Sequence, residues 1–93
     1  MNTAGDAGDG NPVFRGRIAK ALRSWLNRLQ VILEQAQERR ETRSEADPKS
    51  VATLIVASLE GALMISRTQR NDEALRRIQS HLKRYLDKEV AAA

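Results

Sequence analysis

The 93-residue sequence contains no cysteine, one histidine and three aromatic residues. Without cysteine the chain cannot form a disulfide, a thiolate nucleophile or a cysteine-ligated metal site. The single histidine, His81, cannot build a multi-histidine site. The sequence also has no glycine-rich phosphate loop and no paired acids at metal-binding spacing. These absences predict a protein that is not an enzyme and that uses no cofactor and no metal.

Long apolar runs are scarce as well. The longest apolar stretch, Val51 to Ile65, is shorter than a bilayer span and is broken by Thr53, Ser58 and Glu60. The first residues lack the basic and apolar regions of a secretory signal. We therefore expect a cytoplasmic protein that makes no membrane contact.

The first twelve residues differ in composition from the rest. They hold three of the five glycines and one of the two prolines, with almost no apolar side chains. Such a segment cannot bury enough apolar surface to fold, so we expect 1–12 to be a disordered leader and 13–93 to be one helical domain.

Within 13–93, apolar residues recur at steps of three and four, which predicts an all-α fold with three helices. The first helix is expected to begin near Val13 or Phe14 and to run to about residues 39–43. A charged connector without large apolar side chains follows at 37–46. Asp47-Pro48 then predicts an N-cap and a proline at the first position of the second helix.

The second helix is apolar nearly all round between Val51 and Ile65, and Glu60 within it either anchors a buried hydrogen bond or faces solvent. Asn71 and Asp72 predict the cap of the third helix, which presents a narrow apolar seam. Asp72–Arg76 and Glu73–Arg77 are expected ion pairs, and residues 91–93 are expected to fray.

The apolar surface of the second helix exceeds what the other two helices can cover within one chain. At about 25 cal/mol per Å² of buried apolar area, several uncovered aliphatic side chains would forfeit several kcal/mol, which is comparable to the stability of a small domain. We therefore expect a homodimer. Its predicted interface consists of small and apolar residues of the last two helices: Ala57, Ser58, Gly61, Ala62, Ile65, Leu75, Ile78, Leu82 and Tyr85.

Marker residues along the chain resemble the C-terminal half of the TetR family of bacterial repressors. Their order and spacing together carry the resemblance, from Phe14 to Leu86: Phe14-Arg15, Trp25, Glu34-Gln35-Ala36-Gln37, Asp47-Pro48, Leu59-Glu60-Gly61-Ala62-Leu63, Arg67, Leu75 and Tyr85-Leu86. Arg40 departs from the pattern, because family members often have glycine at the end of this helix. We therefore expect the first helix to run on toward Arg43 instead of stopping at a left-handed cap.

The resemblance implies a regulatory domain whose last two helices pair with their counterparts in a four-helix bundle. Such domains usually house a small-molecule pocket, for which Trp25, Leu29 and Met64 are the candidates, although Trp25 also suits a plain core position. In these repressors a separate N-terminal helix-turn-helix reads the operator, and the resemblance does not include it. We therefore expect no direct DNA contact, and the implied partners are a second copy, a full-length TetR-type paralogue and a small-molecule effector.

Three alternatives stay open. The bases Arg15, Arg17, Lys20 and Arg23 of the first helix could bind nucleic acid or an anionic surface, although bases interleaved with acids elsewhere in the chain favour a solvated surface. The last two helices could form a helix-turn-helix, but an all-apolar helix better suits a buried dimer core. The chain could also be a truncated regulator that pairs with an intact paralogue and titrates it.

Overall fold

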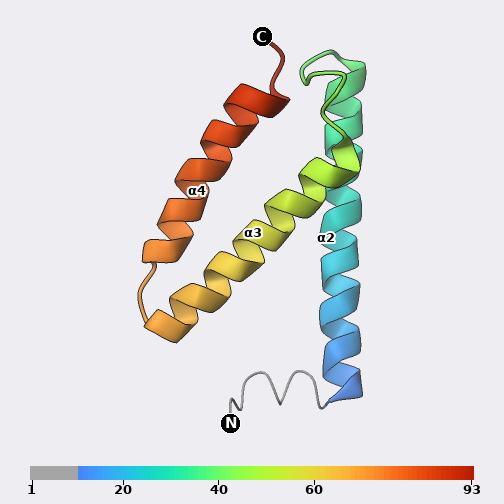
Figure 1. Ribbon diagram of the computed structural model, residues 1–93. Coiled ribbons are helices and arrows are strands. Elements are labelled where there is room, and N and C mark those ends of the chain that lie inside the picture. The colour runs from blue at the N-terminus through green and yellow to red at the C-terminus, as the bar shows by residue number, and fades with distance from the viewer. Residues whose placement is uncertain (1–10) are drawn as a thin grey trace.

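The computed structural model describes residues 11–93, so residues 1–10 of the expected leader lie outside the described part. Three helices follow in order: α2 (Pro12–Glu38), α3 (Pro48–Gln69) and α4 (Glu73–Tyr85), which a short π-helical segment, η1 (Leu86–Val90), continues. The prediction of an all-α fold with three helices is confirmed for residues 11–93. Figure 1 shows α3 between the other two helices, and α3 contacts both of them.

The three helices form a thin layer. The principal extents are 48 × 29 × 14 Å, and the shortest is little more than the diameter of one helix, about 10–12 Å. The buried apolar residues are all small or medium-sized: Val51, Ala52, Ala62 and Val90. In the described part of the chain, α2 and α4 have no buried residue. Large apolar side chains therefore remain on the surface of this layer.

Helix α2 begins slightly earlier than predicted, inside the expected leader. The Asn11 side-chain oxygen accepts a hydrogen bond from the Phe14 N–H at 3.1 Å, and Pro12 occupies the first helical position. This is an ordinary N-cap. Proline is well tolerated at the first helical position, because an N–H there would have no partner within the helix. Residues 11 and 12 therefore belong to the helix start.

The predicted extension of α2 toward Arg43 is wrong. The helix ends at Glu38, and Arg40 adopts a left-handed conformation with φ 60° although it is not glycine. The Arg40 N–H donates to the Gln37 carbonyl at 3.0 Å, and the Glu41 N–H donates to the Ala36 carbonyl at 2.8 Å. These two bonds form a Schellman motif, which satisfies carbonyls that a straight helix end would leave open.

Helix α3 ends in the same way. Arg70 has φ 56°, its N–H donates to the Arg67 carbonyl at 3.3 Å, and the Asn71 N–H donates to the Ser66 carbonyl at 3.1 Å. Both helix ends therefore place an arginine where glycine is preferred, at a cost of roughly 1–2 kcal/mol each.

The connector between α2 and α3 is tied down by one side chain. The Gln37 amide nitrogen donates to three backbone carbonyls, those of Arg43 at 3.1 Å, Ser44 at 3.3 Å and Ala46 at 3.0 Å. At its far end the Asp47 carboxylate accepts from the Ser50 N–H at 3.0 Å and from its hydroxyl at 2.7 Å. The predicted Asp47-Pro48 start of α3 is confirmed.

The end of the chain pairs with this connector. Thr42 and Ala91 form an isolated antiparallel bridge, the Arg43 N–H donates to the Val90 carbonyl at 2.8 Å, and the Ala92 N–H donates to the Glu41 carbonyl at 3.0 Å. Val90 is buried. The prediction that the segment from Ala91 onward frays is therefore wrong for Ala91 and Ala92, which have backbone partners far away in the sequence.

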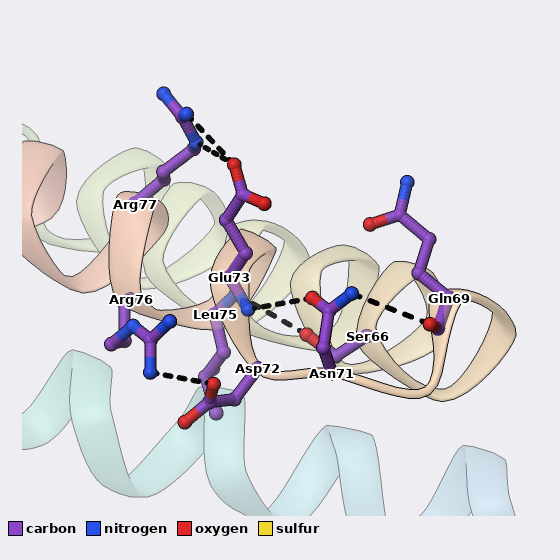
Figure 2. A network of polar contacts seen from close by, with 8 residues as sticks. All are labelled: Ser66, Gln69, Asn71, Asp72, Glu73, Leu75, Arg76 and Arg77. Atoms are coloured by element: carbon purple, nitrogen blue, oxygen red, sulfur yellow. Dashed lines mark hydrogen bonds and ion pairs between the residues drawn. The ribbon is translucent and has the colours of Figure 1, made fainter.

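Figure 2 shows the turn between α3 and α4. The Asn71 side-chain oxygen accepts from the Glu73 N–H at 3.0 Å, while Asp72, at the N-cap position, makes no capping bond with its side chain. Asp72 instead pairs with Arg76 at 2.7 Å, and Glu73 pairs with Arg77 at 2.8 Å, as predicted.

Ser66 links the two helices directly. Its hydroxyl oxygen accepts a hydrogen bond from the Leu75 N–H at 3.3 Å, close to the start of α4 (Figure 2). The first turn of α4 is thus held against the last turn of α3, which fixes where Leu75 lies relative to the α3 surface.

Candidate effector cavity and uncovered helix face

A cavity of about 580 Å³ lies among the three helices and is largely open to solvent. This volume falls in the range of about 300–1,000 Å³ that is typical of small-molecule sites. Eight of the ten residues that line it are apolar and two are charged. The lining residues are Trp25, Arg28, Leu29, Ile32, Ile55, Val56, Leu59, Glu60, Leu63 and Leu75.

Helical spacing brings these side chains together. Trp25, Arg28, Leu29 and Ile32 follow one another on α2 at steps of three, one and three, so they share one face of that helix. The α3 residues from Ile55 to Leu63 follow the same rule. Leu75 comes from the first turn of α4, which Ser66 holds in place.

The three predicted pocket residues separate into two groups. Trp25 and Leu29 line the cavity. Trp25 is 49% exposed, so within this chain it forms an open wall and not a closed core. Met64 is not a lining residue and is 70% exposed.

Within residues 11–93, nothing covers the other side of α3. Its exposed residues recur at helical spacing and form what we call the uncovered α3 face: Thr53, Leu54, Ala57, Gly61, Met64, Ile65 and Thr68. A Cβ placed at Gly61 would meet nothing within 4 Å. The face therefore combines three large apolar side chains with two small residues at its centre.

The polar groups of this face already have partners. The Thr53 hydroxyl donates to the Lys49 carbonyl at 2.7 Å, and the Thr68 hydroxyl donates to the Met64 carbonyl at 2.9 Å. Since both hydroxyls are satisfied inside their own helix, another surface can cover the face without leaving a donor unpaired.

The predicted interface residues are spread over several environments. Ala57, Gly61 and Ile65 lie on the uncovered α3 face, and Ser58 lies at its half-buried edge. Ala62 is packed inside its own chain with 2% exposure, so it has little surface to offer to a second copy.

The remaining predicted residues are on α4. Ile78, Leu82 and Tyr85 are half-buried and follow one another at steps of four and three, while Leu75 contributes to the cavity. Leu54 is not among the predicted interface residues and Met64 is a predicted pocket residue, but both lie on the uncovered α3 face. Spacing gives the signal for both, because Leu54 and Met64 stand three residues from Ala57 and Gly61, respectively.

The basic residues of α2 that form the alternative nucleic-acid surface lie on the outside of the helix. Arg15, Arg17, Lys20 and Arg23 are all exposed on α2. The four ion pairs of residues 11–93 involve none of them, and all four pairs are solvent-exposed and contribute little to stability. The hydrogen bonds from Ser50 lower the pKa of the Asp47 carboxyl, which favours the ionised cap at the start of α3.

A family model described as "Tetracyclin repressor-like, C-terminal domain" matches residues 1–82, most of the chain. The chain belongs to this family. Among solved structures, it is similar to a TetR transcriptional regulator from Chloroflexus aurantiacus J-10-FL, with 31% sequence identity and a TM-score of 0.85. Among curated proteins, none matches the sequence significantly.

The similarity to the Chloroflexus regulator covers 98% of this chain and 46% of that chain. This chain thus spans less than half the length of the solved regulator. Family membership confirms the resemblance inferred from the marker residues, and it identifies the chain as a soluble domain of a non-enzymatic family of regulators.

This membership also bears on the hydropathy of α3. The helix is 22 residues long, and an 18-residue window within it reaches a mean hydropathy of 1.4, with 17% of the window buried. Length and composition alone would therefore suffice to cross a membrane. The core helix of a soluble helical protein passes the same test of length and composition.

Proposed function

We propose that this chain is the dimerisation and effector-binding part of a TetR-type transcriptional regulator. The uncovered α3 face carries the proposal, because it is apolar, has its hydroxyls satisfied and presents small residues at its centre. A second copy of α3 and α4 across a two-fold axis would cover this face and would form a four-helix bundle.

The energetics require both helices. Leu54, Met64 and Ile65 are 42%, 70% and 48% exposed. Complete burial of such a side chain contributes about 1.5–3 kcal/mol, so covering their exposed parts contributes roughly 1 kcal/mol each, or about 6 kcal/mol over two copies. Association costs about 4–15 kcal/mol, so the seam of Ile78, Leu82 and Tyr85 must contribute as well.

Light scattering on a size-exclusion column tests the dimer. We expect twice the chain mass at micromolar concentration, and Ile65→Lys should shift the protein toward the monomer because it places a charge on the uncovered α3 face. A wild-type chain that stays monomeric would refute the proposed dimer. A full-length TetR-type paralogue would use the same face and should form mixed dimers with this chain.

The cavity is the proposed effector site. Its volume, its apolar lining and its two charged groups match the usual design of small-molecule pockets. As part of a regulator of transcription, the chain would act in the cytoplasm. We expect this part of the regulator to make no direct contact with DNA. A mobility-shift assay with arbitrary duplex DNA at moderate salt should show no complex, whereas a shift that Arg17→Glu and Arg23→Glu abolish would favour the basic surface of α2 instead.

A further inference from the structure

Glu60 is the unusual member of the cavity lining. It is half-buried in the middle of α3, and the α3 residues beside it in the lining are Val56, Leu59 and Leu63. Neither the ion pairs nor the side-chain hydrogen bonds of residues 11–93 include its carboxylate. No buried side-chain oxygen of residues 11–93 lacks a partner, so the unpaired Glu60 carboxylate keeps some contact with solvent and is accessible to a donor or a positive charge that enters the cavity.

Arg28 does not fill this role. It lines the same cavity from α2, but no nitrogen of its guanidinium lies within 4.0 Å of a Glu60 oxygen, and its side chain is exposed. Water and salt screen an exposed charge more strongly than a half-buried one. The charge that a ligand meets inside the cavity is therefore mainly that of Glu60.

Trp25 supplies a second group suited to a positive charge. Its indole forms part of the α2 wall and is about half exposed, so a ligand can reach the ring. The negative face of an indole attracts cations within about 6 Å of the ring centre. The rest of the lining is aliphatic and favours an apolar body.

We propose that the cavity binds a lipophilic cation of drug size, with its charge held by Glu60 and Trp25 and its apolar body against the aliphatic lining. This proposal rests on the proposed effector function, and it adds the chemical class of the effector. It also explains why a carboxylate stands on the apolar cavity side of α3.

Two probes of the same shape and opposite charge test the proposal: tetraphenylphosphonium and tetraphenylborate. Trp25 is the only tryptophan, so selective excitation reports binding at the cavity directly. We expect tetraphenylphosphonium to quench the wild-type protein saturably. Glu60→Gln should raise its dissociation constant by about five- to tenfold and should leave that of tetraphenylborate unchanged or lower it.

Arg28→Gln is the matched control, because it removes the other charge of the lining. It should leave cation binding unchanged or strengthen it. Circular dichroism should show the same helical content in both variants, since neither residue holds the fold together through a polar contact.

The outcomes separate the two proposals. If both probes bind and Glu60→Gln alters neither, the cavity is an effector site without charge selection, and the cation proposal is wrong. If tetraphenylborate alone binds and Arg28→Gln abolishes this, the site prefers anions and the proposal is again wrong. If neither probe nor a neutral aromatic such as naphthalene binds, the effector function itself fails.

Discussion

Replacing Gly61 with leucine tests whether the uncovered α3 face is the dimer interface. A Cβ at this position meets nothing within 4 Å, so a single protomer accommodates the new side chain. Glycine inside a helix is about 0.8–1.0 kcal/mol less favourable than alanine, and leucine is nearly as good as alanine. The isolated protomer should therefore become more stable by roughly 1 kcal/mol.

The dimer should change in the opposite direction. A two-fold axis places residue 61 of both copies in the same interface, so two leucines enter it. Each overpacked side chain costs about 1–3 kcal/mol, so the dimer loses about 2–6 kcal/mol. Even the lower value raises the dissociation constant about thirtyfold. Opposite signs in protomer stability and in dimer affinity are the signature of a surface that is open within the chain and filled in the dimer.

Sedimentation at several concentrations measures the affinity, and urea unfolding at the same concentrations measures the stability. In the wild type the unfolding midpoint should rise with concentration, because dimerisation is linked to folding. In Gly61→Leu that dependence should vanish, while the midpoint at the lowest concentration should exceed that of the wild type. Gly61→Ala is the control: it keeps the gain in helix stability with less crowding. A Gly61→Leu dimer as tight as the wild type would refute the assignment of this face.

Three further predictions concern the helix ends and the connector. Arg40→Gly should stabilise the fold by about 0.5–1 kcal/mol in urea unfolding, because glycine removes the left-handed strain at φ 60°. Arg40→Ala should not stabilise the fold, because alanine keeps that strain. Equal effects of the two variants would show that the arginine side chain matters and not its backbone conformation. Gln37→Glu should lower the free energy of unfolding by about 1–3 kcal/mol, because a carboxylate would face three carbonyls, and Gln37→Ala should lower it less. If Gln37→Glu leaves the free energy of unfolding unchanged, the amide hydrogen bonds do not stabilise the connector. The hydrogen bonds from Ser50 lower the pKa of Asp47 from its ordinary value of 3.8. The ionised cap therefore contributes its full stability at pH values above 3.8, and this contribution is lost as the pH falls through the lowered pKa. The Tm difference between wild type and Asp47→Ala should therefore shrink in acid, and a constant difference would contradict the assignment.

The helices themselves could be predicted from the sequence because their signals are local. Apolar residues at steps of three and four reveal each helix, and Asp47-Pro48 marks one start without ambiguity. The end of α2 could not be predicted, because the residue at its left-handed position is an arginine. What stops the helix there is the pair of Schellman hydrogen bonds together with the connector that Gln37 holds in place.

The pairing of the chain end with the connector was equally hidden. Thr42 and Ala91 are far apart in the sequence, and neither belongs to a periodic pattern that would predict a β-bridge. Three alanines at a terminus resemble a fraying end in every local respect. Only the packing of α4 against α3 brings Ala91 to residues 41–43, and a contact that depends on tertiary packing leaves no mark in the local sequence.

The two sides of α3 show how far the residues of the candidate site could be placed from the sequence. The sequence shows that the helix is apolar nearly all round, which requires two covers, but a composition argument does not say which residue belongs to which side. Helical geometry does: Leu59 and Leu63 line the cavity, whereas Gly61 and Met64 face the opposite way. Met64, a predicted pocket residue, is therefore not in the lining of this cavity. One helix thus carries a cavity wall and an uncovered face, and this explains why a chain with so few fully buried residues has so much apolar sequence.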